Sequence, residues 1–279
     1  MSHPLVVEAA ESLFVPMLVH NNRSGVDQKI LKRFGEPAWN NPVIRFVDKN
    51  EKDVIARRDG IWTTSGVVSR MIAALQSQKV AVPDYLRIVA AEEDSREETA
   101  TFAMYCFWQG EVDLGGLPGV KRTEAAWLHG KEVVEVVFDP RVVSYEKLVQ
   151  TAQNLKCAST VFARNEAQFR VAKRLVGRDA ELTRDAIRPA KQSDRKFYLN
   201  RTALRYLPLT PMQATKVNAA LLNRQSYNSL LSPRQKQLLT KVTAVKDDAK
   251  IVRQLQSLNR PNDVKMLAEY EEKLAAIFE

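Results

Sequence analysis

The sequence predicts a mixed α/β protein of the α+β type, followed by a mostly helical C-terminal extension. Up to about residue 158, short apolar runs bounded by turn residues alternate with stretches of helical periodicity. From Asn165 onward the composition shifts to helix formers with many Lys, Arg and Gln. The chain has 279 residues, 45% of them hydrophobic, which is enough for two domains and an appendage.

The first part of the chain predicts the order helix, strand, helix, strand, strand, helix. Apolar residues at helical spacing predict a helix over residues 4–13, and the apolar run at 14–19 predicts a buried strand. Asp27 is a candidate N-cap for the next helix, which runs to Phe34. Turn residues then separate this helix from a predicted hairpin.

Pro42 opens this hairpin, which consists of strands at 43–48 and 53–56 and precedes a last helix to about residue 78. This order resembles the later part of a thioredoxin fold, in which a cis proline lies beside the redox site. The resemblance implies a thioredoxin-like domain over residues 1–80 that lacks its first strand and Cys-x-x-Cys loop. Two alternatives stay open: Pro42 simply begins an edge strand, or the reading frame starts further upstream.

Residues 81–97 predict a linker helix and a charged connector, and residues 98–175 predict a second domain. Its order of strand, helix, strand, strand, helix is that of a ferredoxin-like α+β unit. The near-continuous valine run within 132–138 is typical of a strand that is covered on both faces. The predicted elements of this domain span residues 99–106, 108–116, 119–128, 132–138 and 144–155.

Residues 176–279 predict a basic helical extension without a recognisable motif. Thr210 and Ser232 are natural N-caps, because each precedes a proline that suits the first helical position. The apolar runs at 197–199 and 204–207 are candidates to dock the extension onto the preceding domain. The helices predicted from Asn165 onward span residues 164–176, 211–223, 232–243, 247–258 and 262–278.

The motif that bears chemistry lies where a short apolar strand ends at Cys106 and a helix or tight turn begins at Trp108. Free N–H groups at the start of a helix stabilise a thiolate, which is the reactive form of cysteine. A cysteine between Tyr105 and Phe107 that only fills the core is the alternative.

The residues around Cys106 follow a longer pattern. The Cys-Phe-Trp motif at 106–108 is followed by Glu111 and by Leu-Pro-Gly-Val at 117–120. Further downstream come a Glu-rich valine strand ending in Asp-Pro at 131–140 and Ser-Tyr-Glu-Lys-Leu at 144–148. In order and spacing, these motifs over about residues 98–158 resemble the active-site segment of the A-type peptide methionine sulfoxide reductases.

The resemblance implies a thiol-dependent oxidoreductase that reduces peptide-methionine (S)-S-oxide. Cys106 is then the nucleophile, which attacks the sulfoxide sulfur and becomes a sulfenic acid. Glu132 aligns with the family's catalytic glutamate and would supply the proton for the substrate oxygen. Cys157 is the candidate to resolve the sulfenic acid as a disulfide. Phe107 and Trp108 would line the pocket for the substrate methyl group.

Glu111 and His129 are the remaining candidates for substrate binding. His129 lies in a short turn where the family has a long loop, whose tyrosine helps to bind the sulfoxide oxygen. His129 is therefore the candidate replacement, and a surface histidine is the alternative. The chain also departs from the family at the glycines that flank Cys-Phe-Trp, because Tyr105 and Gln109 stand there.

The predicted chemistry requires no bound cofactor or metal, only an external thiol reductant such as thioredoxin. The expected partners are that reductant and an oxidised protein or peptide substrate. Two cysteines and three scattered histidines do not form a zinc-site pattern. No apolar run approaches a membrane span, and the first residues lack the layout of a secretory signal, so the cytoplasm is the expected location.

Two other functions remain open. In the first, the protein is a catalytically degenerate redox adaptor that binds oxidised or partner proteins without turnover. In the second, the basic extension binds nucleic acid, which a formal net charge of +9 permits. The second has weak support, because no aromatic-interleaved basic motif accompanies the charge.

Overall fold

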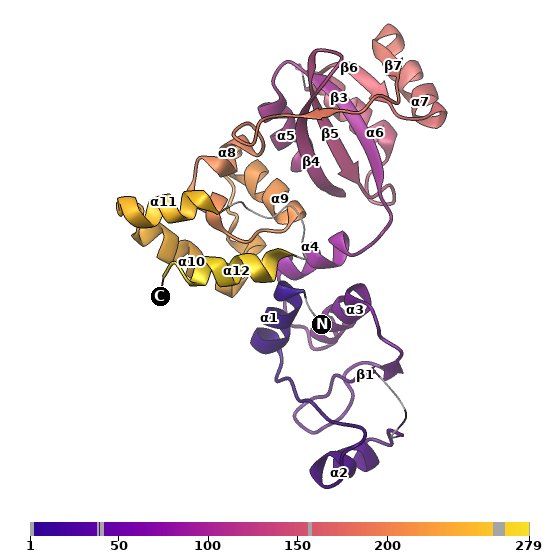
Figure 1. Cartoon of the computed structure of the whole chain (residues 1–279). Coiled ribbons are helices and arrows are strands. Elements are labelled where there is room, and N and C mark those ends of the chain that lie inside the picture. Colours follow the sequence, from indigo (N-terminus) through magenta and orange to yellow (C-terminus); the bar gives the residue numbers. More distant parts are fainter. Residues whose placement is uncertain (1–2, 38, 40–41, 156–157, 259–265, 279) are drawn as a thin grey trace. The chain divides into compact units, whose positions relative to one another are not determined.

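The computed structural model describes residues 3–37, 39, 42–155, 158–258 and 266–278 (Figure 1). The chain forms two compact units, residues 1–93 and residues 94–279. Its mixture of helices and a mixed sheet confirms the predicted α+β class. The finer division into four segments stays a prediction.

The N-terminal unit is mainly helical, with a core formed by its first helix and its last two helices. Leu5, Val68 and Leu86 are fully or almost fully buried in this core, one from each of these helices. The helices expected at 4–13 and before residue 78 are confirmed. The elements are α1 (Pro4–Leu13), α2 (Val26–Arg33), β1 (Val43–Ile44), β2 (Arg58–Asp59), α3 (Thr64–Ser77) and α4 (Asp84–Glu92).

Three local expectations in this unit are wrong. Residues 14–19 form no strand, and Val15 is 96% exposed. Pro16 within this run has no N–H for a sheet ladder, which explains why apolar character alone misleads here. Asp27 is not the cap of α2, because Gly25 holds that position. Residues 53–56 do not form the expected partner strand, because β1 pairs instead with β2 at Arg58–Asp59 over two residues, and the expected partners meet only in a bridge between Val47 and Asp53.

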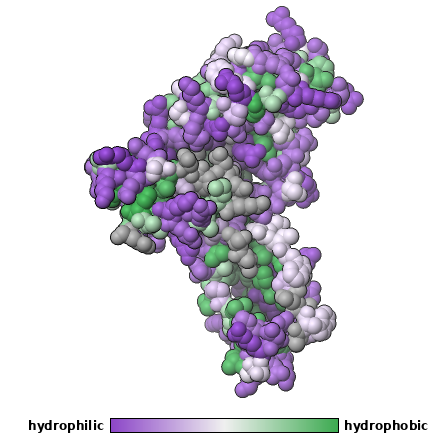
Figure 2. All heavy atoms as spheres, in the orientation of Figure 1, coloured by the Kyte–Doolittle hydropathy of each residue, from purple (hydrophilic) through white to green (hydrophobic). Residues whose placement is uncertain are grey.

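A thioredoxin-like fold is therefore not confirmed for the N-terminal unit. The carbonyl of Pro42 accepts a hydrogen bond from the N–H of Gly60 (3.1 Å), so Pro42 lies at the start of the β1–β2 pair. Its role beside a redox site stays a prediction. Apolar side chains reach the surface in this unit (Figure 2), and Trp39 and Trp62 are 81% and 74% exposed.

The C-terminal unit is built on a six-stranded sheet in the order β7-β6-β3-β5-β4-β8. Three helices, α5 (Phe107–Gly115), α6 (Tyr145–Asn154) and α7 (Glu166–Val176), accompany it. The strands are β3 (Glu98–Met104), β4 (Val120–Leu128), β5 (Lys131–Phe138), β6 (Ala158–Ala163), β7 (Ala180–Leu182) and β8 (Arg188–Pro189).

Within this sheet, β6, β3, β5 and β4 are antiparallel neighbours in the ferredoxin-like arrangement. The predicted strands and helices of this domain are confirmed within a few residues. Strand β6 was not expected. Nor were strands β7 and β8, because pairings of two or three residues leave no periodic signal. Both come from the segment after α7, so residues beyond 175 extend the sheet at its two edges.

Both faces of the sheet are covered, as the valine run of β5 predicts. Val134 and Val136 are fully buried on the face that carries α5 and α6. Val133 is fully buried on the opposite face, beside Phe162 and Ile187. Because successive side chains of a strand point to opposite faces, even-numbered residues of β5 lie on the face with α5 and α6, and odd-numbered residues lie on the other face.

Gly110 allows α5 to approach the sheet closely. An added Cβ would lie 2.6 Å from Met104 Cε and 2.9 Å from Val134 Cγ2, and the branched valine cannot easily move away. We expect Gly110→Ala to lower the free energy of unfolding by about 1–2 kcal/mol, because the steric overlap costs more than alanine gains from its higher helix propensity. Urea denaturation checks this. Gly116→Ala is the control, since its Cβ would meet only ordinary contacts at 3.4 Å and 3.7 Å.

The predicted helices of the extension are confirmed as α9 (Pro211–Leu222), α10 (Pro233–Ala244), α11 (Ala249–Ser257) and α12 (Leu267–Ala275), preceded by the short α8 (Phe197–Asn200). The start of the last predicted helix, at residues 262–265, lies outside the described residues. Thr210 and Ser232 cap α9 and α10 as expected, and each cap is completed by a glutamine three residues later. These glutamines, Gln213 and Gln235, are fully buried and bond to each other through both amide groups, at 2.8 Å and 3.0 Å.

Candidate active site

Cys106 lies at the junction between strand and helix. It follows β3 and is the N-cap residue of α5, with an extended backbone (φ −143°, ψ 107°). Its side chain is a free thiol and is half-buried. The N-terminus of α5 therefore places its partial positive charge beside this thiol.

Glu132, at the start of β5, reaches the same helix end. Its Oε2 atom accepts a hydrogen bond from the N–H of Phe107, the first residue of α5 (2.9 Å). The side chain of Cys106 does not cap the helix. The Glu132 carboxyl group instead accepts a hydrogen bond from one of the N–H groups that are left free at the helix start. Cys106 and Glu132, which are 26 positions apart, are thereby brought to one helix terminus.

Four aromatic rings surround this terminus. Phe107 is buried and meets Trp127 edge-on, with ring centroids 5.7 Å apart, and Trp127 is the cross-strand partner of Glu132. Trp108 is stacked on Phe197 with centroids 3.8 Å apart and planes 15° from parallel. Phe107 and Trp108 thus lie beside Cys106 as predicted, but whether they contact a substrate methyl group stays a prediction.

The ring of Phe197 belongs to the extension, which is anchored to α5 by a buried ion pair. Glu111 is fully buried, and its carboxylate accepts hydrogen bonds from the side chain of Lys196 (2.5 Å) and from the backbone N–H of the same residue (2.7 Å). The Lys196 ammonium group also bonds to the carbonyl of Thr123. These contacts give Glu111 a structural role, and its predicted contact with substrate remains untested.

His129 makes its contacts away from Cys106. Its two ring nitrogens bond to Glu181 (2.8 Å) and Asp185 (2.7 Å), and its ring meets Phe162 edge-on. Phe162 packs on the sheet face opposite to α5. The hydrogen bond to Asp185 is the main cause that raises the pKa of His129 above its usual value. A role for His129 at the sulfoxide oxygen therefore gains no support from its surroundings.

Cys157, the predicted resolving cysteine, lies outside the described residues. Among those that the structure describes, no group of three His, Cys, Asp or Glu side chains could hold a metal ion. The described part of the chain also has no helix with the length and apolar character that a membrane crossing requires.

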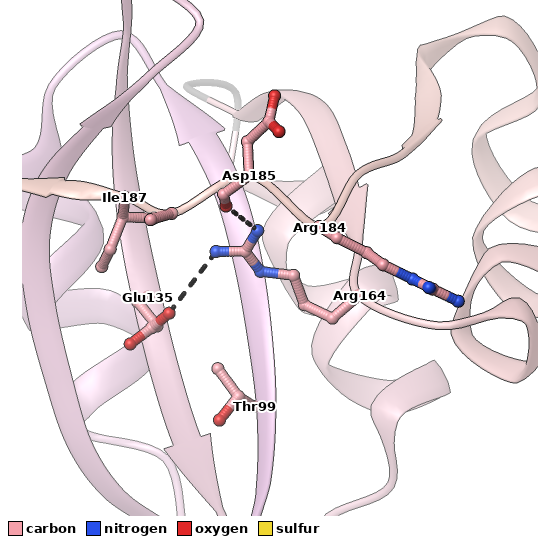
Figure 3. Close-up of a pocket in the computed structure, with 7 residues that line it drawn as sticks. Thr99, Glu135, Arg164, Arg184, Asp185 and Ile187 are labelled. Atoms are coloured by element: carbon pink, nitrogen blue, oxygen red, sulfur yellow. Dashed lines mark hydrogen bonds and ion pairs between the residues drawn. The ribbon is translucent and has the colours of Figure 1, made fainter.

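A separate pocket opens on the sheet face that carries His129 (Figure 3). Arg164 crosses it, within 3.7 Å of the Glu135 carboxylate and bonded to the carbonyl of Asp185 (2.7 Å). Burial raises the pKa of Glu135, and the charge of Arg164 opposes this rise. Arg184 points away from the pair in Figure 3. None of the predicted site residues lines this pocket, so the chemistry of the thiol belongs to the other face.

Fold and site together define a class: a ferredoxin-like α+β domain with a thiol at a helix N-terminus and a carboxyl group beside it. Comparison with curated proteins agrees with this class. The chain is similar to peptide methionine sulfoxide reductase A5 of Oryza sativa subsp. japonica, with 38% identity over 66 residues, covering 19% of this chain and 26% of the relative.

Two bacterial proteins named peptide methionine sulfoxide reductase MsrA are also similar. That of Cronobacter sakazakii is 40% identical over 70 residues, covering 19% of this chain and 33% of the relative. That of Dickeya dadantii is 33% identical over 105 residues, covering 32% and 44%. The chain thus contains a domain similar to MsrA and spans a quarter to under half of the length of these relatives. No protein-family model matches the chain.

The sequence did not reveal Lys196 and Phe197 as neighbours of the site. The expectation that the apolar run at 197–199 docks on the preceding domain is confirmed by the stacking of Phe197 on Trp108. Nothing in the spacing of the residues could pair Glu111 with a lysine 85 positions away.

Proposed function

We propose that the C-terminal unit is a thiol-dependent oxidoreductase that reduces peptide-methionine (S)-S-oxide. The observation that carries the proposal is the meeting of Cys106 and Glu132 at the N-terminus of α5, through the 2.9 Å hydrogen bond from Phe107. The similarity to named methionine sulfoxide reductases supports the choice of substrate.

In the proposed reaction the Cys106 sulfur attacks the sulfoxide sulfur, and Glu132 supplies a proton to the oxygen. Two electrons pass from the cysteine to the substrate, so that the products are the thioether and a Cys106 sulfenic acid. Cys157 condenses with the sulfenic acid to give a disulfide and water, and an external dithiol of the thioredoxin type reduces the disulfide. Because thiols carry both electrons, the cycle needs no bound cofactor.

Glu132→Gln tests the proton donor. Glutamine keeps an oxygen that can accept the Phe107 N–H but has no acidic proton, so we expect single-turnover reduction to slow by about 10²–10³-fold. Rapid quench of the pre-reduced protein with a methionine sulfoxide peptide measures this rate. Glu124→Gln is the control, because Glu124 lies on the neighbouring strand and bonds to Arg195 instead (3.5 Å). An unchanged rate in Glu132→Gln contradicts the assigned role.

The adaptor hypothesis, in which the protein binds oxidised peptides without turnover, is tested by measuring peptide binding and methionine release together. The wild-type protein would then retain the sulfoxide peptide in equilibrium dialysis and release no methionine from it. This combination contradicts the proposed function.

A further inference from the structure

The aromatic rings beside Cys106 form one row, and a guanidinium group lies over the ring at each end of it. Consecutive members of the row are in contact, in the order Arg188, Trp127, Phe107, Trp108, Phe197 and Arg201. The two middle rings belong to the residues that directly follow Cys106 in the chain. The reactive thiol is therefore attached at the middle of the row, and the cations are at its ends.

Arg188 reaches its end of the row through the pairing of three strands. It is the cross-strand partner of Trp127, which is in turn the partner of Glu132. Directly opposite residues of antiparallel strands point to the same face, so Arg188 lies on the sheet face of Glu132 and α5. Its Cζ atom is 5.9 Å from the centroid of the Trp127 ring. Strand β8 thus adds a cation to the face that carries the site.

Arg201 is held at the other end of the row by the extension. Its Cζ atom lies 3.9 Å from the centroid of Phe197, whose ring is stacked on Trp108 at 3.8 Å. The buried ion pair between Lys196 and Glu111 anchors the start of the same short segment. Contacts of the fold therefore determine where this guanidinium group lies.

Both arginines are exposed, and neither has an ion pair with any residue that the structure describes. Arg195, which lies between them in the sequence, differs in this respect because it is paired with Glu124 (3.5 Å). A guanidinium group that is held against a ring keeps the N–H groups at its edge, in a fork that matches a carboxylate. The two ends of the row are therefore suited to bind carboxylates.

We propose that Arg188 and Arg201 determine the substrate specificity of the Cys106 site, and that they select peptides in which acidic residues flank the methionine sulfoxide on both sides. This inference rests on the proposed function and names its substrate class. The oxidised methionine reaches the thiol at the middle of the row, and the flanking carboxylates bind the guanidinium groups at its ends. An extended peptide rises about 3.3 Å per residue, so acidic side chains two or three positions from the methionine reach these ends.

The test compares the binding of two methionine sulfoxide peptides, one with glutamate and one with lysine at the second and third positions on both sides of the methionine. Fluorescence anisotropy with the full-length Cys106→Ser protein reads binding without turnover. We expect the glutamate peptide to bind about 10-fold more tightly at low ionic strength, and the difference to shrink as salt is added. When Arg188→Gln and Arg201→Gln are both added to this protein, the two peptides should bind equally.

Arg178→Gln together with Arg184→Gln is the matched control, because this pair removes the same net charge from two exposed arginines outside the row. Arg178 precedes β7, at the opposite edge of the sheet from β8, and Arg184 lines the pocket on the other sheet face (Figure 3). The control should keep the preference for the glutamate peptide. The inference is overturned if the Cys106→Ser protein shows no preference, or if both pairs of substitutions change the preference equally.

Single variants test the placement of the two arginines at opposite ends. With glutamate on only one side of the methionine, Arg188→Gln should weaken the binding of one of the two peptides, and Arg201→Gln should weaken that of the other. Weakening of the same peptide by both variants contradicts this placement. If the wild-type protein reduces no methionine sulfoxide, the proposed function fails, and the binding preference still decides whether the two arginines recognise acidic peptides.

Discussion

Cys106→Ser is expected to abolish the reduction of methionine sulfoxide. Serine can occupy the N-cap of α5 but cannot give up two electrons to the substrate sulfur, so no residual pathway remains in the proposed reaction. The experiment uses the pre-reduced full-length protein in a single turnover, with each sulfoxide diastereomer supplied separately. The wild-type protein should yield methionine from the S epimer only, and the variant should yield none.

Cys157→Ser separates the first step from the second. This variant should still release one equivalent of methionine, because Cys106 alone carries that step. Its sulfenic acid should then persist and react with dimedone, whereas the wild-type protein forms a disulfide. Methionine from Cys106→Ser would remove Cys106 from the mechanism, and equal yields from both epimers would contradict the assigned specificity for the S epimer.

Lys196→Met is expected to have the largest effect on stability. It leaves the fully buried Glu111 carboxylate without its ammonium partner, and loss of one member of a buried pair costs about 3–5 kcal/mol. Urea denaturation measures the free energy of unfolding. Lys273→Met is the matched control: its ion pair with Glu269 has the same 2.5 Å separation but is about 60% exposed, so its loss should cost less than about 1 kcal/mol.

A second variant shows whether the cost arises from the unpaired charge. In the double variant Glu111→Gln, Lys196→Met, both charges are gone and the glutamine oxygen still accepts the N–H of residue 196. We expect this protein to recover most of the lost stability, since a buried pair contributes little more than its neutral replacement. If the double variant is as unstable as Lys196→Met, the lost packing of the lysine chain, and not the charge, is the cause.

The sequence predicted most of the C-terminal unit, because the signals there are local. Thr210 and Ser232 cap their helices as expected, and the valine run of β5 is covered on both faces. The sequence also placed Cys106 at a strand end, where α5 begins one residue earlier than predicted. Local signals of this kind survive in the fold because the tertiary contacts agree with them.

The predictions of strands fail where contacts between residues far apart in the sequence determine whether a strand forms. The run at 14–19 is apolar enough for a strand but finds no partner strand, and Val15 stays exposed. Strands β7 and β8 exist only because residues after α7 return to the edges of the sheet. In the site, the sequence does not reveal that Glu111 is paired with Lys196, and the predicted contact of Glu111 with substrate stays a prediction. Likewise, the contacts of His129 with Glu181 and Asp185 depend on how β7 and its following loop return.

The paired glutamines of the extension have a consequence for how that part of the chain folds. The amide nitrogen of Gln213 donates to the carbonyl of Leu230 as well as to Gln235, and that of Gln235 donates to the carbonyl of Pro208 as well as to Gln213. Each helix start therefore satisfies polar groups in the loop that leads into the other helix. If one helix unfolds, the amide nitrogen of the other helix's glutamine loses both of its acceptors in the protein, so we expect the two helices to unfold together. Helices α9 and α10 thus form one cooperative folding unit, in which the two initiation sites are mutually dependent.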